Sequence, residues 1–251
     1  MVNDVSHAAA GAGALPFLSP VEALDERAVR QLQEARLRGQ YAYLWAHSPF
    51  YQRRFRAAGL TPDSVRTIDD LQRVPCTTKQ ELRDSLRAAP PFGEHLAAPI
   101  DDVIQMQASS GTTGSPSYVA LTRQDALMWH ESSARSLYAC GIRPGDRVLH
   151  GFSLSKGFVG GLPIFQALQH LGALDIPIGA DGGVERLLTA AFDLRPDAIV
   201  GTPNFLLHLA EAAQALLGRD VRELGVRRLV VGGEPGGGIP ALRHRIQDAW
   251  G

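Results

Sequence analysis

The sequence SSGTTGSP, which runs from Ser109 to Pro116, lies between two apolar runs at 103–106 and 118–121 that are typical of β-strands. Its glycines allow positive φ angles and a close approach of the backbone to a ligand. Its Ser and Thr hydroxyls donate hydrogen bonds without a fixed charge. A turn of this kind directs several N–H groups at one point, and such a nest binds phosphate oxygens. A plain hairpin turn is the structural alternative, but the order of the residues favours a phosphate-binding loop.

This loop matches neither of the two commoner phosphate-binding patterns. The Walker pattern ends in Gly-Lys-Ser/Thr, and no Lys occurs between Ser109 and Ser117. The dinucleotide fingerprint needs G-x-G-x-x-G at the start of a helix, and that spacing is also absent. The sequence therefore predicts phosphate binding by hydroxyls and backbone N–H groups.

Composition limits the class of protein. The 251 residues suffice for one large or two ordinary domains, and contents of 45% hydrophobic and 20% charged residues are typical of a soluble globular protein. A formal net charge of −1 gives no electrostatic reason to expect nucleic acid or a membrane surface as partner. The two cysteines, Cys76 and Cys140, have no metal-ligand spacing, which indicates free thiols in a reducing cytoplasm. Scattered histidines argue against a zinc site.

The first hundred residues read as a leader followed by helices. Residues 1–19 begin with an Ala- and Gly-rich stretch that lacks the pattern of a signal peptide, so we expect a disordered leader. Over 20–48 the apolar residues recur at helical spacing, which predicts one long helix capped by Ser19. Three shorter helices are expected at 50–59, 67–71 and 77–82. Residues 20–100 are therefore predicted to form a helical region.

From residue 101 onward, strand and helix patterns alternate. Strands are expected at 147–150, 173–178, 197–200 and 227–231, and helices at 123–140, 160–171, 184–193, 204–217 and 239–250. This alternation predicts an α/β fold, with the helical N-terminal region followed by a mostly parallel sheet flanked by helices. No closing element precedes Gly251, so we expect 101–251 to be a partial α/β domain.

Four motifs share the spacing of one enzyme family: SPFY at 48–51, the loop at 109–114, TPNF at 202–205 and GGEP at 232–235. From about Tyr43 to Gly251 the chain resembles the phenylacetate–CoA ligases, a branch of the adenylate-forming enzymes. The resemblance implies that a carboxylate attacks the α-phosphate of ATP to give acyl-AMP and pyrophosphate, after which CoA displaces AMP. It implies ATP, Mg²⁺ and CoA as cofactor and co-substrates, and an aryl or arylacetic acid as substrate.

The resemblance also assigns site residues. The ATP phosphates are assigned to Ser109, Ser110, Gly111, Thr112, Thr113 and Gly114. The adenine is assigned to Gly233, Glu234 and Pro235, just after a predicted strand. The acyl pocket is assigned to Phe158, Gly160, Gly161 and Phe205.

Other groups of that family have no counterpart in this sequence. The magnesium-binding aromatic-Gly-x-Ser/Thr-Glu segment, the ribose-binding Asp and the C-terminal domain with its catalytic Lys are missing. We therefore assign no catalytic and no metal-binding residue and expect the chain alone to be inactive. Two alternatives stay open: a non-catalytic nucleotide- or acyl-binding module, and an enzyme that passes the acyl group to a carrier protein or an amine. The resemblance also allows a homodimer.

Overall fold

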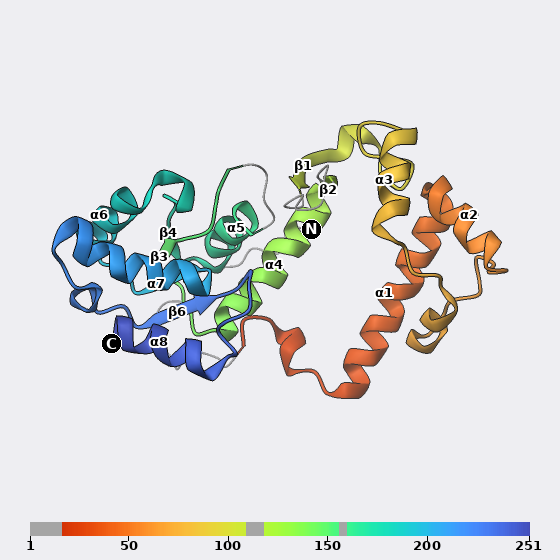
Figure 1. Cartoon of the computed structure of the whole chain (residues 1–251). Coiled ribbons are helices and arrows are strands. Elements are labelled where there is room, and N and C mark those ends of the chain that lie inside the picture. The colour runs from red at the N-terminus through yellow and green to blue at the C-terminus, as the bar shows by residue number, and fades with distance from the viewer. Residues whose placement is uncertain (1–16, 109–117, 156–159) are drawn as a thin grey trace.

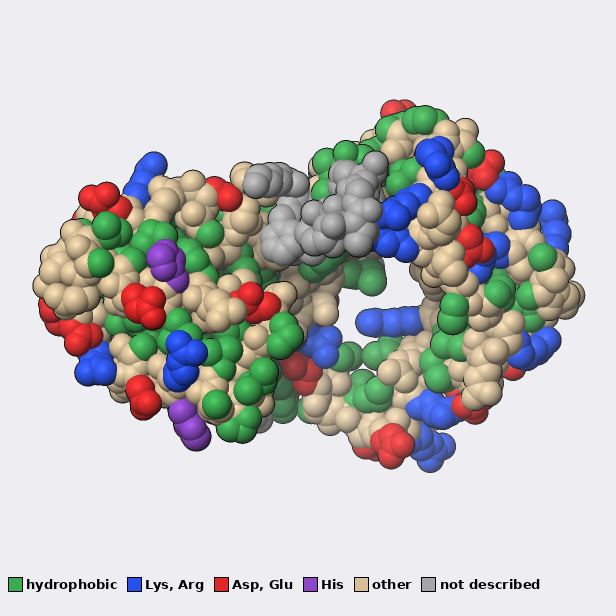
Figure 2. All heavy atoms as spheres, in the orientation of Figure 1, with side chains coloured by type: hydrophobic (Ala, Val, Ile, Leu, Met, Phe, Trp, Pro, Cys, Tyr) green, Lys and Arg blue, Asp and Glu red, His purple; other side chains and the backbone are tan. Residues whose placement is uncertain are grey.

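The computed structural model describes residues 17–108, 118–155 and 160–251, and it has two parts (Figure 1). Helices form the first part, and a parallel sheet covered by helices forms the second. The elements of the first part are a 3-10 turn (Pro20–Ala23), α1 (Glu26–His47), α2 (Pro49–Ala57), a 3-10 turn (Ile68–Arg73), α3 (Lys79–Ala88) and a 3-10 turn (Ile100–Asp102). Figure 2 shows an opening between the two parts.

The start of the predicted helix over 20–48 is wrong. Residues Pro20–Ala23 form a separate 3-10 turn that Ser19 and Glu22 close with a capping box. The chain is then extended at Leu24, and α1 begins at Glu26, where the Asp25 side chain accepts a hydrogen bond from the N–H of Ala28 at 2.7 Å. Two successive cap signals thus divide one apolar pattern into two elements.

The helical part has a small aromatic core. Its buried side chains are Tyr41, Phe55, Leu60 and Val65. The Phe55 ring lies 4.8 Å from the Tyr41 ring and 5.7 Å from the Trp45 ring, measured between centroids, within the range of favourable aromatic pairs. Phe55 therefore lies at the centre of the contact between α1 and α2.

An antiparallel hairpin and one helix connect the two parts. Strand β1 (Val103–Ala108) pairs with β2 (Tyr118–Thr122), and Ala108 lies opposite Tyr118. Both strands agree with the sequence prediction, and the loop between them, 109–117, lies outside the described residues. Helix α4 (Arg123–Ala139) follows at once, because Thr122 and Asp125 form a capping box. In Figure 1, α4 runs between the hairpin and the parallel sheet.

The parallel sheet has the strand order β4-β3-β5-β6. Its elements are β3 (Arg147–His150), α5 (Leu162–Leu171), β4 (Leu174–Ile176), α6 (Val184–Leu194), β5 (Ala198–Gly201), α7 (Pro203–Ala212), β6 (Arg228–Val231) and α8 (Pro240–Trp250). The strands and helices expected from the sequence in this part are all present, and most of their ends differ from the expected ones by one or two residues. The helix expected over 204–217 ends at Ala212 and continues as one π turn, Ala213–Leu217.

Two apolar clusters cover the two faces of this sheet. Val148 and Val200 pack against α4 and α5 on one face. Leu149 and Ile199 pack against α6, α7 and α8 on the other. Successive strand residues point to opposite faces, so both faces of the central strands β3 and β5 are buried and these strands read as nearly continuous apolar runs. These layers confirm the predicted α/β fold (Figure 1). Among the described residues, no helix is long and apolar enough to cross a membrane.

Candidate functional site

The strand order reverses between β3 and β5. After β3 the chain crosses to α5 on one face of the sheet and reaches β4. It then returns through α6 on the other face to β5, on the opposite side of β3, and leaves β5 through α7. The connections that follow β3 and β5 therefore diverge to opposite faces. In open α/β sheets, ligands bind in the crevice that such a divergence leaves at the carboxyl ends of the strands.

Glycines bring the backbones together at this crevice. The N–H of Gly151, directly after β3, donates to the Val200 carbonyl at 2.7 Å, and a Cβ at Gly151 would lie 2.7 Å from that oxygen. Such a Cβ would also lie 3.5 Å from the Phe205 ring. A side chain larger than hydrogen at position 151 would therefore separate β3 from β5.

The predicted adenine loop closes one side of the crevice. Gly233 has a φ of +86°, which favours glycine, and a Cβ there would lie 3.5 Å from Thr202 and 3.7 Å from the Phe152 ring. The N–H of Asn204 donates to Oε1 of Glu234 at 2.9 Å. The loop after β6 is thus anchored to the first turn of α7, and the carboxylate lies at the positive end of that helix.

A carboxylate also fixes the segment that leaves β3. The Ser153 hydroxyl donates to the two Asp181 oxygens at 2.8 and 2.7 Å, and the Ser155 N–H donates to Oδ2 at 2.9 Å. These hydrogen bonds hold the pKa of Asp181 below its ordinary value, and the bond from the Ser153 hydroxyl contributes most. Gly161 packs directly against the same segment, because a Cβ there would lie 1.9 Å from the Ser153 carbonyl oxygen. The start of α5 therefore approaches the exit of β3 through a glycine.

Six of the thirteen predicted site residues lie within the described part of the chain. The structure places these six on the segments that follow β3, β5 and β6: Gly160, Gly161, Phe205, Gly233, Glu234 and Pro235. The six phosphate-loop residues and Phe158 lie outside the described residues. Their roles in binding stay predictions.

Sequence reasoning gave no site role to Gly151, Phe152, Thr202 or Asp181, although Thr202 opens the TPNF motif. The signal for the first three was available, because each follows a predicted parallel strand by one or two positions. No sequence pattern indicates Asp181, which reaches Ser153 across 28 positions of the chain.

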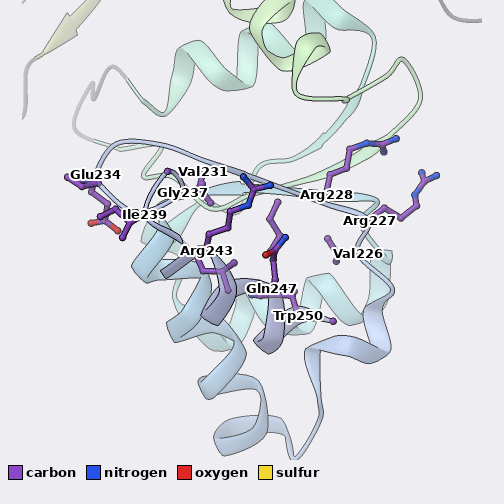
Figure 3. A pocket seen from close by; sticks show the side chains of 16 residues that line it. Val226, Arg227, Arg228, Val231, Glu234, Gly237, Ile239, Arg243, Gln247 and Trp250 are labelled. Carbon is purple, nitrogen blue, oxygen red and sulfur yellow. The ribbon is translucent and has the colours of Figure 1, made fainter. Parts of the chain in front are cut away.

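The described residues also enclose a pocket of about 980 Å³ between β6 and α8. Apolar side chains of Val231, Ile246 and Trp250 line it, and the glycines at 236–238 form one end. Figure 3 shows Arg243 and Gln247 rising from α8 toward β6, while Arg227 and Arg228 extend away. Within the described parts of the chain, no strand pairs with the outer edge of β6. The pocket therefore follows the open edge of the sheet, next to the predicted adenine loop.

A metal ion would need several ligand atoms that converge on one point. Across 17–108, 118–155 and 160–251, no group of three His, Cys, Asp or Glu residues is placed to hold an ion. The crevice offers instead an aromatic ring, a hydroxyl and glycine backbone from Phe152, Thr202 and Gly233. These groups suit a flat heterocycle such as adenine better than a cation.

Solved structures with the same fold define the class. The chain superposes on 2-hydroxyisobutyryl-CoA ligase, in complex with 2-HIB-AMP and CoA in the thioesterification state, with a TM-score of 0.88 and 31% identity; the match covers 96% of this chain and 51% of that one. The same ligase in the postadenylation state with 2-HIB-AMP gives a TM-score of 0.82 and 31% identity, over 90% of this chain and 47% of that one. The fold is that of part of an acid–CoA ligase.

Sequence relatives narrow the class. The chain is 38% identical to the phenylacetate-coenzyme A ligase of Escherichia coli (strain K12) over 232 residues and 36% identical to that of Pseudomonas putida over 237 residues. These matches cover 92% and 94% of this chain. The predicted relation to the phenylacetate–CoA ligases is therefore confirmed. The chain spans about half the length of these relatives, 51% of each. No protein-family model matches it.

Proposed function

We propose that this chain carries the nucleotide- and acid-binding part of an AMP-forming acid–CoA ligase. In the proposed reaction a carboxylate oxygen attacks the α-phosphorus of ATP, the bond to pyrophosphate breaks, and acyl-AMP forms. The CoA thiolate then attacks the acyl carbon, and AMP leaves. The observation that carries the proposal is the convergence of Phe152, Thr202 and Gly233 where the strand order reverses.

The proposed roles follow from position. Residues 109–114 hold the phosphates through N–H and hydroxyl groups, and Gly233, Glu234 and Pro235 border the adenine. Gly160, Gly161 and Phe205 border the acyl group, together with Phe158. Magnesium neutralises phosphate charge when bound, which the first step needs more than a protein nucleophile. An aryl or arylacetic acid is the proposed substrate class.

The division into a leader at 1–19, a helical region at 20–100 and a partial AMP-binding domain at 101–251 is also a proposal. Exposed free thiols at Cys76 and Cys140 support a cytoplasmic location. A homodimer is proposed from the family resemblance alone.

Nucleotide binding is tested first, by calorimetry with ATP and AMP. Gly233→Ala adds a methyl between Thr202 and Phe152, and we expect affinity about tenfold weaker. Gly225→Ala is the matched control, because Gly225 also has a positive φ, +65°, but no atom lies within 4 Å of the added carbon. Equal affinity in both variants, or no nucleotide binding by the wild-type chain, contradicts the proposal.

The acid and the acceptor need a separate test. The sequence contains neither the family's magnesium motif nor its catalytic Lys, so we propose that the 251-residue chain binds nucleotide without pyrophosphate exchange. Acid-dependent ATP–pyrophosphate exchange by this chain, with a panel of aryl, arylacetic and short hydroxy acids, contradicts that part. CoA-dependent release of AMP by the full-length protein separates the ligase from an enzyme that uses a carrier protein or an amine.

A further inference from the structure

A histidine and an aspartate are buried beside the crevice, and the proposed reaction uses neither. His150, the last residue of β3, is 0% exposed, and the side chain of Asp175 on β4 is 2% exposed. Nδ1 of His150 lies 3.3 Å from Oδ1 of Asp175. Because a carboxylate only accepts hydrogen bonds, the imidazole donates from Nδ1.

This pair lacks the contacts that usually accompany burial. Nε2 of His150 and Oδ2 of Asp175 have no hydrogen-bond partner in the part of the chain that the structure describes. Among the described residues, nothing offsets the cost of burying these two polar atoms. Two apolar side chains of similar volume would fill the space at a lower cost in stability. The presence of the pair points to a role other than stability.

One ring connects the pair to the crevice. The Phe152 ring meets the His150 ring edge to face, with 6.2 Å between centroids and 77° between planes. Cε1 of Phe152 also lies 3.7 Å from the place of a Cβ at Gly233. The backbone of Phe152 is held separately, because its carbonyl accepts from the N–H of Ala180 at 3.1 Å. The backbone of Phe152 is therefore fixed without His150, and the contact with His150 restricts the orientation of the ring.

We propose that His150, oriented by Asp175, is a positioning residue that holds the Phe152 ring against Gly233 and so shapes the adenine side of the crevice. Neither member of the pair touches the nucleotide. Asp175 fixes the imidazole, the imidazole fixes the Phe152 ring, and the ring limits the space at Gly233. The inference rests on the proposed function for its ligand, but the ring contact itself exists without any ligand.

The test changes Asp175 rather than His150, because removal of the histidine leaves a buried carboxylate without a partner and risks unfolding. Asp175→Leu removes the acceptor and frees the imidazole, whereas Asp175→Asn keeps an acceptor oxygen. Gln166→Leu is the control: it removes a part-buried pair of hydrogen bonds with Gln105, at 2.9 and 3.1 Å, that does not involve Phe152.

We expect Asp175→Leu to bind AMP about 3- to 10-fold more weakly, the fold-change that one aromatic contact is worth. Asp175→Asn and Gln166→Leu should bind as the wild type does, although Gln166→Leu also loses stability. Wild-type affinity in a folded Asp175→Leu chain overturns the inference, and so does an equal loss of affinity in Gln166→Leu.

A second measurement needs no nucleotide. The N–H of Gly232 donates to the Gly201 carbonyl at 3.1 Å, next to the contact between Phe152 and Gly233. Hydrogen exchange at Gly232 should be faster in Asp175→Leu and unchanged in Gln166→Leu. If the wild-type chain binds no nucleotide, the proposed function fails, while this exchange pattern still supports or overturns the positioning role.

Discussion

The helical part and the sheet part of this chain are stabilised in different ways. The helical part packs a few aromatic rings around Phe55, and it carries a partly buried ion pair, Arg54–Glu81, and exposed ones such as Arg30–Asp69. The sheet part buries aliphatic side chains on both faces, so that each strand lies between two helical layers. One side chain therefore matters more in the helical part, whereas the sheet part has many equivalent contacts and can carry the glycines of a site.

Phe55→Ala is expected to have the largest effect. Its ring contacts the rings of Tyr41, Trp45 and Tyr51, so its loss opens the centre of the small core, at about 3–5 kcal/mol. Fluorine NMR of chains labelled with fluorotryptophan, during urea unfolding, follows Trp45 and Trp250 separately. We expect the Trp45 transition to move to much lower urea than the Trp250 transition. Identical shifts of both signals would show that the two parts unfold as one unit and would contradict separate stabilisation of the helical part.

Leu206→Ala tests the sheet part. Leu206 is fully buried on α7, and its carbonyl accepts a hydrogen bond from the Trp250 indole at 3.1 Å. We expect a loss of about 2–5 kcal/mol, as for other buried leucines, seen first in the Trp250 signal. Leu216→Ala, at an exposed leucine close by in sequence, is the control and should change stability little. A larger shift at Trp45 than at Trp250 is the opposite result.

Sequence reasoning succeeded where the signal is local. Thr122 and Asp125 lie three positions apart and form a capping box at the start of α4, close to the expected start of that helix, and each parallel strand is recognisable as a short apolar run between turns. It failed at the start of α1, because an apolar helical pattern continued across two separate cap signals. Propensity and period do not show which of two successive N-caps begins the long helix.

The site, too, has features that the sequence shows and features that only the fold shows. The glycine-rich turns after β3 and β6 are visible in the sequence, and the resemblance gave them roles. The strand order is not visible, and it is the strand order that brings Phe152 to Gly233 across some eighty positions. The pairing of His150 with Asp175 depends on the register of β3 against β4, which no local pattern encodes.

Acid should weaken the sheet part through Asp197, the smallest of the three effects. The side chain and N–H of Arg147 both donate to its carboxylate, at 3.1 and 3.0 Å, and Arg227 donates at 2.9 Å. These contacts lower the pKa of Asp197 to about 2, and the hydrogen bonds from Arg147 contribute most. Because the folded pKa is depressed, the stabilisation is complete above the unfolded pKa near 3.8 and is lost as pH falls toward 2.

With an allowance for screening by solvent, the contribution is roughly 1 kcal/mol. Asp197→Asn should therefore lower the free energy of unfolding of the Trp250 transition by that amount at neutral pH, and the difference from the wild type should vanish near pH 2. Asp70→Asn is the comparison in the helical part, because hydrogen bonds from the N–H groups of Arg66 and Thr67 lower the pKa of Asp70 too. That variant should act on the Trp45 transition. If Asp197→Asn keeps a constant difference from the wild type across this pH range, the carboxylate stabilises the sheet by shape and not by charge.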